Sequence, residues 1–162
     1  MTYIKQLTLL VCLAACITAC KKKEVEEFDN VAQFQKDTTA IRAFLKANNI
    51  TEGTIHPEYG IYYHIINPGS GNVSYKGATQ VTTNYVGRLL NGTVFDTTNG
   101  IPRKFQLNEV IAGWYFGIPM VQKGGQLRLI IPSFYAYGNR GDSRVPKNSI
   151  LDFDITVVDV AQ

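Results

Sequence analysis

The stretch YVGRLLNGTVFD at residues 85–96 indicates two β-strands joined by a tight turn. Its Asn91-Gly92 pair, flanked by apolar side chains, is the strongest short-range signal for a β-hairpin. The chain on either side of the pair is rich in β-branched and aromatic residues, which suit a pleated, half-buried strand. We expect strands over residues 80–90 and 93–96, paired antiparallel across this turn.

Four more extended segments and one short helix are expected around this hairpin. The extended segments cover residues 61–66, 104–107, 126–131 and 151–160. Asn108 can cap a short helix that begins at Glu109, because an Asn side chain accepts a hydrogen bond from the first helical turn. No long crossover helices alternate with the strands, so we expect an α+β fold with an antiparallel sheet.

A longer helix is expected before the sheet. Asp29 or Asn30 can cap it, and the pair Asn48-Asn49 ends it near Ala47. Mostly apolar positions recur at spacings of three or four, which places them on one face: Val31, Phe34, Thr38, Ile41, Phe44 and Leu45. We expect residues 31–55 to form a helical extension. Its apolar face either packs on the chain's own sheet domain, which is the simpler interpretation, or pairs with a second copy to form a dimer.

Residues 1–19 resemble the signal peptide of a bacterial lipoprotein. Lys5 supplies a positive charge, and the apolar run that follows is short for a membrane-spanning helix. Two tetrapeptides resemble a lipobox, in which the final cysteine carries the lipid: LAAC ends at Cys16 and ITAC ends at Cys20. LAAC matches better by its letters, but we favour Cys20, because a run of three lysines would then follow the lipid directly. An ordinary secretion signal is the alternative.

Residues 20–30 are charged and poor in apolar side chains, so we expect a tether. A lipid next to a basic run provides the two signals that stable membrane anchoring requires. The expected location is therefore the bacterial cell envelope, with the chain anchored by its N-terminal lipid to a membrane and facing the periplasm or the cell exterior.

Composition excludes several classes of function. The formal net charge is +3, and no stretch interleaves basic and aromatic residues, so nucleic acid is not an expected partner. All three cysteines lie within the first twenty residues, which excludes a disulfide or a cysteine nucleophile in the rest of the chain. Two histidines are too few for most metal sites. No acid–base dyad or serine triad stands out, and we expect neither a metal nor a cofactor.

Five segments, taken in order, resemble the FKBP-type peptidyl-prolyl cis-trans isomerases. They are YVGRLLNGTVFDTT at 85–98, VIAGW at 110–114, GGQLRLIIP at 124–132, YAYG at 135–138 and VPKNSILDFD at 145–154. The resemblance covers residues 60–162 and implies a curved antiparallel β-sheet wrapped around a short α-helix. It also implies an enzyme that acts on proline-containing polypeptides and assists the folding of exported proteins.

Rotation about a prolyl amide needs no nucleophile. Resonance gives the C–N bond a barrier of about 18–20 kcal/mol, and a catalyst need only bind the twisted amide better than the planar one. An apolar pocket favours the twisted amide, because the planar form is the more charge-separated. The chain supplies aromatic side chains in quantity for such a pocket.

The resemblance assigns a role to each candidate site residue. Trp114 is the expected floor beneath the proline ring, and Tyr85, Phe95 and Phe153 are the expected walls. The backbone N–H of Ile111 and the hydroxyl of Tyr137 are expected to bind substrate carbonyl groups, with Asp96 at the edge near the twisting amide. The remaining expected pocket residues are Phe105, Val110 and Val145.

Three residues depart from the family pattern. Arg103 stands near a position where some members carry an aromatic residue, which predicts a more open and polar wall. Pro119 predicts an early helix end by Gly117 or Ile118, and Lys147 replaces a proline in the loop at 136–148, the expected flap over the pocket. Two rival interpretations remain: a non-catalytic module that docks proline-containing segments of an envelope complex, and an inert scaffold that dimerises through its N-terminal helix.

Overall fold

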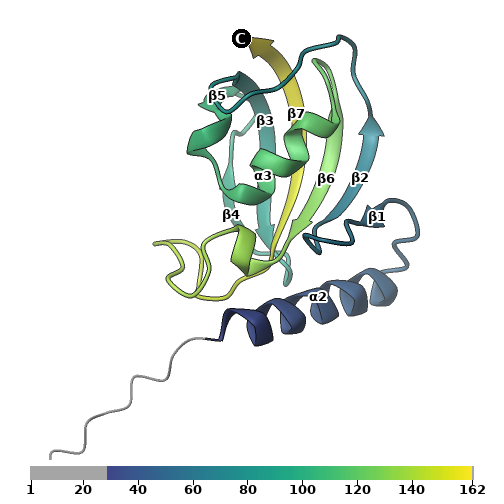
Figure 1. The fold of residues 1–162 in the computed structure, drawn as a ribbon, viewed down its shortest axis with the longest axis vertical. Helices are drawn as coiled ribbons and strands as arrows, with labels where there is room; N and C mark the ends of the chain where they lie inside the picture. Colours follow the sequence, from purple (N-terminus) through teal and green to yellow (C-terminus); the bar gives the residue numbers. More distant parts are fainter. Residues whose placement is uncertain (1–28, 162) are drawn as a thin grey trace, which may run out of the picture.

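Seven antiparallel strands form one curved sheet in the computed structural model, which describes residues 29–161 (Figure 1). The strand order is β1-β2-β6-β7-β3-β4, and β5 also pairs with β3. The strands are β1 Thr54–Ile55, β2 Tyr62–Asn67, β3 Gln80–Leu89, β4 Val94–Thr97, β5 Arg103–Gln106, β6 Gln126–Ile131 and β7 Leu151–Ala161. Within the described residues, no helix is both long enough and apolar enough to cross a bilayer.

The two longest strands, β3 and β7, form the centre of the sheet. Their register runs from Gln80 opposite Ala161 to Leu89 opposite Leu151. Along β3, buried and half-exposed residues alternate, as expected when one face of a strand covers a core and the other meets solvent. The strand predicted over residues 80–90 is therefore confirmed, and it ends one residue earlier, at Leu89.

A short helix, α3 Ala112–Gly117, lies across the concave face of the sheet (Figure 1). Two glycines allow it to approach β6 closely. A Cβ atom at Gly113 would lie 2.5 Å from Cγ2 of Ile131, and one at Gly117 would lie 2.5 Å from Cδ1 of Leu129. The helix ends at Gly117 and a 3₁₀ turn, Ile118–Met120, follows, so the effect predicted for Pro119 is confirmed.

The expected start of this helix was wrong. Leu107–Glu109 form a 3₁₀ turn, and α3 begins three residues later, at Ala112, without a side-chain cap. Asn108 instead donates its backbone N–H to the carbonyl oxygen of Gly77, at 2.9 Å. Leu107 likewise donates to the carbonyl oxygen of Thr79, at 3.1 Å, so the turn is bonded to a loop distant in sequence.

The N-terminal helix, α2 Asn30–Ala47, agrees with the prediction. Asp29 caps it by accepting hydrogen bonds at 2.9 Å from the backbone N–H groups of Val31 and Ala32. The helix runs beneath one end of the sheet (Figure 1). Ile41 is fully buried in a small cluster with Tyr62 of β2 and Ile130 of β6, so the apolar face packs on the chain's own domain.

Two positions of the expected apolar face differ from the prediction. Val31 is 67% exposed and lies outside the packed face. Asp37, absent from the predicted face, is buried. Its Oδ2 accepts hydrogen bonds from the backbone N–H of Ser133, at 2.8 Å, and from its hydroxyl, at 2.5 Å. Gln33 donates to the other carboxylate oxygen at 2.7 Å, so this buried carboxylate joins α2 to the sheet domain.

Candidate active site

An aromatic cluster lies between α3 and the concave face of the sheet, with Trp114 at its centre. The Trp114 ring centroid lies 5.0 Å from that of Tyr85, 5.3 Å from that of Phe153 and 5.7 Å from that of Phe105. These three pairs meet edge to face, as does Phe95 against Phe153 at 5.5 Å. Edge-to-face geometry is an arrangement that aromatic quadrupoles favour, so these contacts stabilise the cluster beyond the burial of its area.

A cavity of about 220 Å³ opens above this cluster. Its lining is aromatic and aliphatic with a few polar groups: Tyr85, Phe95, Asp96, Phe105, Glu109, Val110, Ile111, Trp114, Tyr137 and Phe153. A larger hollow, of about 410 Å³, lies over Asn84, Thr97 and Thr156. The smaller cavity is the better candidate site, because ligand sites combine an apolar lining with a few convergent polar groups.

Two local features of the sheet place the phenylalanine walls. Gly87 pairs with Asp96 and Arg88 pairs with Val94, so Phe95 is the extra residue of a β-bulge. Bulges next to active sites turn a side chain toward a new direction, here into the cavity. Gly87 leaves room for the rings, since a Cβ atom there would lie 2.6 Å from Cε1 of Phe153 and 2.9 Å from Cζ of Phe95.

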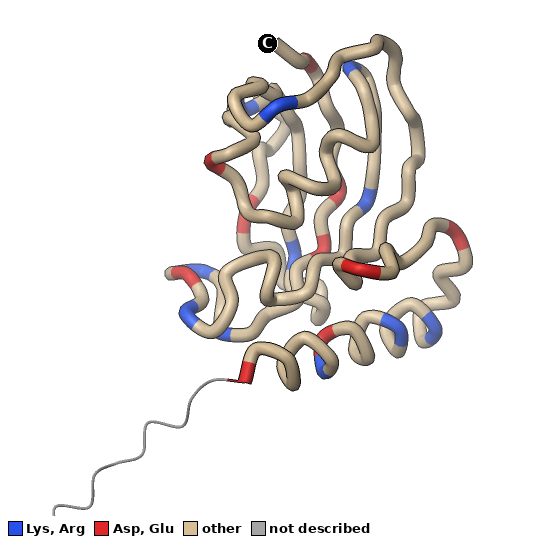
Figure 2. The backbone as a smooth tube through the Cα atoms, in the orientation of Figure 1, with Lys and Arg blue, Asp and Glu red and all other residues tan. Residues whose placement is uncertain are grey.

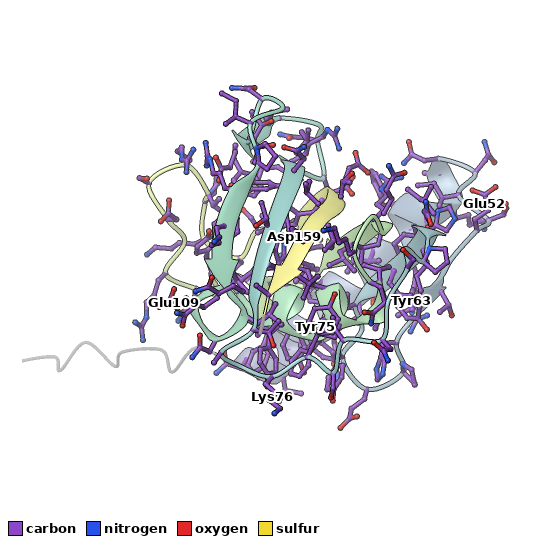
Figure 3. All side chains as sticks on the ribbon, turned by 90° about the horizontal axis from the view of Figure 1, so that it is seen from above. Glu52, Tyr63, Tyr75, Lys76, Glu109 and Asp159 are labelled. Atoms are coloured by element: carbon purple, nitrogen blue, oxygen red, sulfur yellow. The ribbon has the colours of Figure 1, made fainter. Side chains whose placement is uncertain are left out.

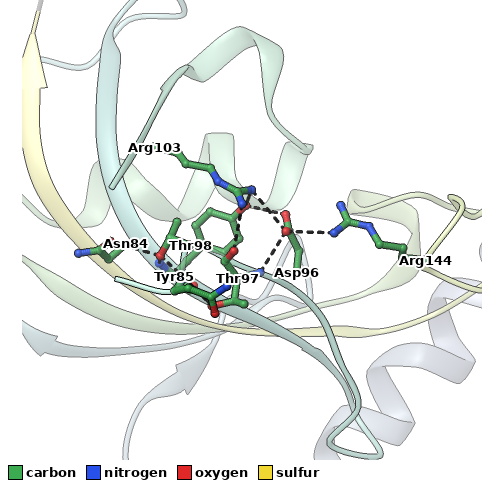
Figure 4. Close-up of polar contacts among 8 residues, drawn as sticks. Asn84, Tyr85, Asp96, Thr97, Thr98, Arg103 and Arg144 are labelled. Atoms are coloured by element: carbon green, nitrogen blue, oxygen red, sulfur yellow. Dashed lines mark hydrogen bonds and ion pairs between the residues drawn. The ribbon is translucent and has the colours of Figure 1, made fainter. Parts of the chain in front are cut away.

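Asp96 lies at one edge of the cavity, within a network of donors (Figure 4). Its Oδ2 accepts a 2.6 Å hydrogen bond from the hydroxyl of Tyr85, and its Oδ1 accepts the backbone N–H of Thr97 at 3.0 Å. Two guanidinium groups also reach Oδ1, that of Arg144 at 3.2 Å and that of Arg103 at 3.4 Å. Arg103 donates to the Tyr85 hydroxyl as well, at 3.2 Å.

This network keeps Asp96 ionised and Tyr85 protonated. Burial alone would raise the pKa of Asp96, but the Tyr85 hydroxyl and the two guanidinium groups outweigh burial and lower that pKa below its ordinary 3.8. Burial, followed by the hydrogen bond to Asp96 and the charge of its carboxylate, raises the pKa of Tyr85 to about 12. At neutral pH Asp96 is therefore a carboxylate that accepts hydrogen bonds, and Tyr85 carries a neutral hydroxyl that donates one.

Two donors at the cavity have no acceptor among the described residues. The indole Nε1 of Trp114 is buried and makes no hydrogen bond. The backbone N–H of Ile111, just before α3, likewise meets no acceptor in residues 29–161, while its carbonyl oxygen accepts from Trp114. Nε1 of Trp114 is itself buried, whereas Ile111 lines the cavity and is only partly buried, so its N–H is available to a carbonyl group bound there.

The flap, residues 136–148, borders the cavity through Tyr137 and carries charges of both signs (Figure 2). Burial raises the pKa of Tyr137, so its hydroxyl is a donor at neutral pH. Val145 differs from its expected place on the rim. Its side chain is 2% exposed within the hydrophobic core, and it is absent from the cavity lining.

Nine of the ten residues expected at the pocket line this single cavity, and Val145 is the exception. Glu109 and Arg144 were missed. Glu109 lines the cavity and lies at the periphery of the molecule (Figure 3). It was expected in the first turn of the short helix, but it belongs to the 3₁₀ turn that precedes α3. Arg144 reaches Asp96 across 48 positions of sequence, and no local pattern signals such a contact. Arg103 lies at the cavity's polar edge, where a polar wall was expected.

Comparisons with known proteins agree with this geometry. The family model for the FKBP-type peptidyl-prolyl cis-trans isomerases matches residues 71–158. FkpA of Escherichia coli K12 is 40% identical over 103 residues, which cover 62% of this chain and 38% of FkpA. A probable FKBP-type isomerase of Haemophilus influenzae is 33% identical over 151 residues, which cover 91% of this chain and 60% of that protein. The matched part of the chain thus spans less than two thirds of the length of these relatives.

Solved structures give the same result. The crystal structure of E. coli FkpA superposes with a TM-score of 0.68 at 32% identity, covering 80% of this chain and 61% of that one. A peptidyl-prolyl cis-trans isomerase from Pseudomonas syringae pv. tomato superposes with a TM-score of 0.66 at 28% identity, covering 84% of this chain and 98% of that one. From the fold, the aromatic cavity and the extent of the family match, this chain belongs to the FKBP-type peptidyl-prolyl cis-trans isomerases.

Proposed function

We propose that this chain catalyses peptidyl-prolyl cis-trans isomerisation and assists the folding of exported proteins. The observation that carries the proposal is the cavity with Trp114 at its base, because this cavity combines an aromatic floor with the Ile111 N–H, which has no acceptor within residues 29–161. Its size and apolar lining suit a proline ring. A folding enzyme of this kind accelerates a step that otherwise takes tens of seconds or longer.

The proposed mechanism is differential binding. The proline ring packs on Trp114 between the walls formed by Phe95 and Phe153, and the apolar surroundings disfavour the planar, charge-separated amide. The N–H of Ile111 and the hydroxyl of Tyr137 bind the flanking carbonyl groups. Asp96 holds the Tyr85 hydroxyl in place beside the rotating bond. No bond is made or broken, and no proton needs to move.

The test is isomerisation of a short Xaa-Pro peptide by residues 21–162, compared with Trp114→Leu and Asp96→Ala. We expect clear acceleration by the unaltered protein and a loss in both variants. A rate equal to that without protein contradicts the proposed activity. Binding of the same peptide without acceleration favours the rival interpretation, a module that docks proline-containing segments. The intact set of Trp114, Tyr137 and Asp96 at one cavity favours the enzyme.

We further propose export and lipid anchoring at Cys20, with Cys16 as the alternative. The proposal assigns residues 1–19 to a signal peptide and 20–30 to a tether, followed by the helix extension at 31–55 and the isomerase domain at 60–162. Both cysteines lie outside the described residues. Supporting it are the two lipobox-like tetrapeptides and the three lysines that follow Cys20. Metabolic palmitate labelling of Cys20→Ala and Cys16→Ala variants in a bacterial host distinguishes the two sites, because only substitution of the lipidated cysteine removes the label. If both variants keep the label, neither cysteine is the single lipidation site.

A further inference from the structure

Arg144 occupies a fixed position beside the candidate site. It lies in a tight turn, in which Asp142 and Val145 exchange backbone hydrogen bonds at 2.7 Å and 3.1 Å. The Asp142 carboxylate also accepts the backbone N–H of Arg144, at 3.4 Å. The buried side chain of Val145 anchors this turn in the core, so the backbone that presents Arg144 is held in place.

Asp96 does not depend on Arg144 for its hydrogen bonds. Tyr85 already donates to Oδ2, and Thr97 and Arg103 already donate to Oδ1. Two guanidinium groups therefore face one carboxylate (Figure 4). Within residues 29–161, the other acidic residue of the cavity lining, Glu109, forms no ion pair with either guanidinium group, so two positive groups share one carboxylate at this edge. The flap itself carries three basic residues against a single acidic one.

Most of the hydrogen-bonding capacity of the Arg144 side chain is unused. Its side chain is 60% exposed, and only Nη1 contacts an acceptor among the described residues. A guanidinium group has five N–H donors, and their planar arrangement matches a carboxylate in a bidentate pair. Arg144 can thus bind a second carboxylate while it still contacts Asp96.

We infer that Arg144 makes this site prefer prolines that directly follow a glutamate or aspartate. The inference rests on the proposed function, in which the rotating amide lies beside Asp96. That amide joins the proline to the residue before it, so the preceding side chain leaves the cavity past Asp96 and meets Arg144. Because the pair is largely exposed, the preference is about two- to fivefold in kcat/KM and weakens as salt screens the charges.

The test uses three peptides that differ only in the residue before proline: Glu, its neutral isostere Gln, and Lys. The expected order of kcat/KM for the unaltered protein is Glu, then Gln, then Lys, with a smaller spread at high salt. Arg144→Gln brings the Glu/Gln ratio close to one, and Arg144→Glu inverts it. Arg140→Gln is the matched control, because Arg140 lies in the same flap and has no ion pair within the described residues. It retains the ratio of the unaltered protein.

A Glu/Gln ratio at or below one in the unaltered protein overturns the inference, as does a ratio that survives Arg144→Gln. A preference seen only when the glutamate follows the proline also overturns it. If the protein accelerates none of the three peptides, the proposed function fails instead. In that case the ratio of dissociation constants, measured from the fluorescence of the single tryptophan, decides the inference by the same criteria, and absence of binding overturns both.

Discussion

The hydroxyl of Tyr85 donates a 2.6 Å hydrogen bond to Oδ2 of Asp96, joining the central strand β3 to the bulged strand β4 at the edge of the cavity. This contact couples the ionisation of both residues to folding. Burial and then this hydrogen bond raise the pKa of Tyr85, while the bond, against the effect of burial, lowers that of Asp96. Each group therefore contributes stability over a defined range of pH.

At acidic pH we expect the protein to lose the stability that ionised Asp96 contributes, because Asp96 becomes protonated. Its pKa in the folded protein lies below the ordinary 3.8, so its contribution is complete above that value and is lost as the pH falls through the folded pKa. Urea unfolding of the unaltered protein and Asp96→Asn should therefore give a constant difference in stability from about pH 7 to pH 5, which shrinks on further acidification. A difference that grows below pH 4 contradicts the lowered pKa.

Tyr85 behaves in the opposite way: its contribution to stability is lost as the pH rises. Its folded pKa is raised from 10.0 to about 12, so its contribution is complete below the unfolded value and is lost as the pH rises toward the folded one. Tyr85→Phe lacks this titration. Between these two values the unaltered protein should lose its stability advantage over Tyr85→Phe, measured as the difference in urea midpoint. An advantage that persists above both values contradicts the assignment.

Gly87→Ala should disturb the two phenylalanine walls. The added methyl group lies 2.6 Å from a Phe153 ring atom and 2.9 Å from a Phe95 ring atom, and both rings are packed. Overpacking of this kind costs about 1–3 kcal/mol, and the displaced rings should also slow isomerisation. Gly77→Ala is the control, since its nearest contact, Cβ of Asn108 at 3.5 Å, is ordinary. Equal activity and unfolding midpoints in the two variants would show that the rings yield without cost.

Asp37→Ala should loosen the contact between α2 and the sheet domain. It leaves the buried N–H of Ser133 without its acceptor, which costs about 1–3 kcal/mol of unfolding free energy. Lys36→Ala is the control: Lys36 is the exposed residue next to Asp37, and its substitution should change the unfolding free energy little.

Size-exclusion chromatography of the same proteins addresses the dimer alternative. With Ile41 covered by the chain's own domain, we expect the unaltered protein to elute as a monomer, and elution of the unaltered protein as a dimer contradicts that view.

Trp114→Leu should separate the role of the pocket floor from that of general stability. Truncating the buried ring lowers the unfolding free energy by about 2–4 kcal/mol and removes the proposed packing surface for the proline ring. Leu127→Ala, fully buried but outside the cavity, should lose comparable stability while retaining activity when assayed well below its unfolding midpoint. Similar losses of activity in both variants would attribute the Trp114 effect to stability alone.

Local signals predicted most of the fold. The cap at Asp29 and the spacing of the apolar side chains placed α2, and the Asn-Gly pair placed the β3–β4 hairpin, with Gly92 at a φ of +88°. Pro119 predicted the end of α3 from its own covalent geometry. Each of these features depends on residues close together in sequence.

The features that were missed depend on distant contacts. The partner of Asp37 lies 96 positions away at Ser133, so a carboxylate in α2 gave no sign of burial. Before α3, Asn108 is bonded to Gly77, 31 positions earlier in the chain, and Arg144 reaches Asp96 across 48 positions. Val145 was expected at the rim from the family pattern, but its side chain anchors the flap in the core.

The central claim is that one cavity both binds proline and accelerates its rotation. The most direct measurement is an NMR titration, in which a short Leu-Pro peptide is added to residues 21–162 from below to above equimolar amounts. The lone indole N–H signal of Trp114 reports binding, and exchange between the cis and trans peptide signals reports catalysis. We predict that the indole signal shifts and that exchange accelerates over the same series. Acceleration with an unmoved indole signal, or a shifted indole without acceleration, would contradict the account.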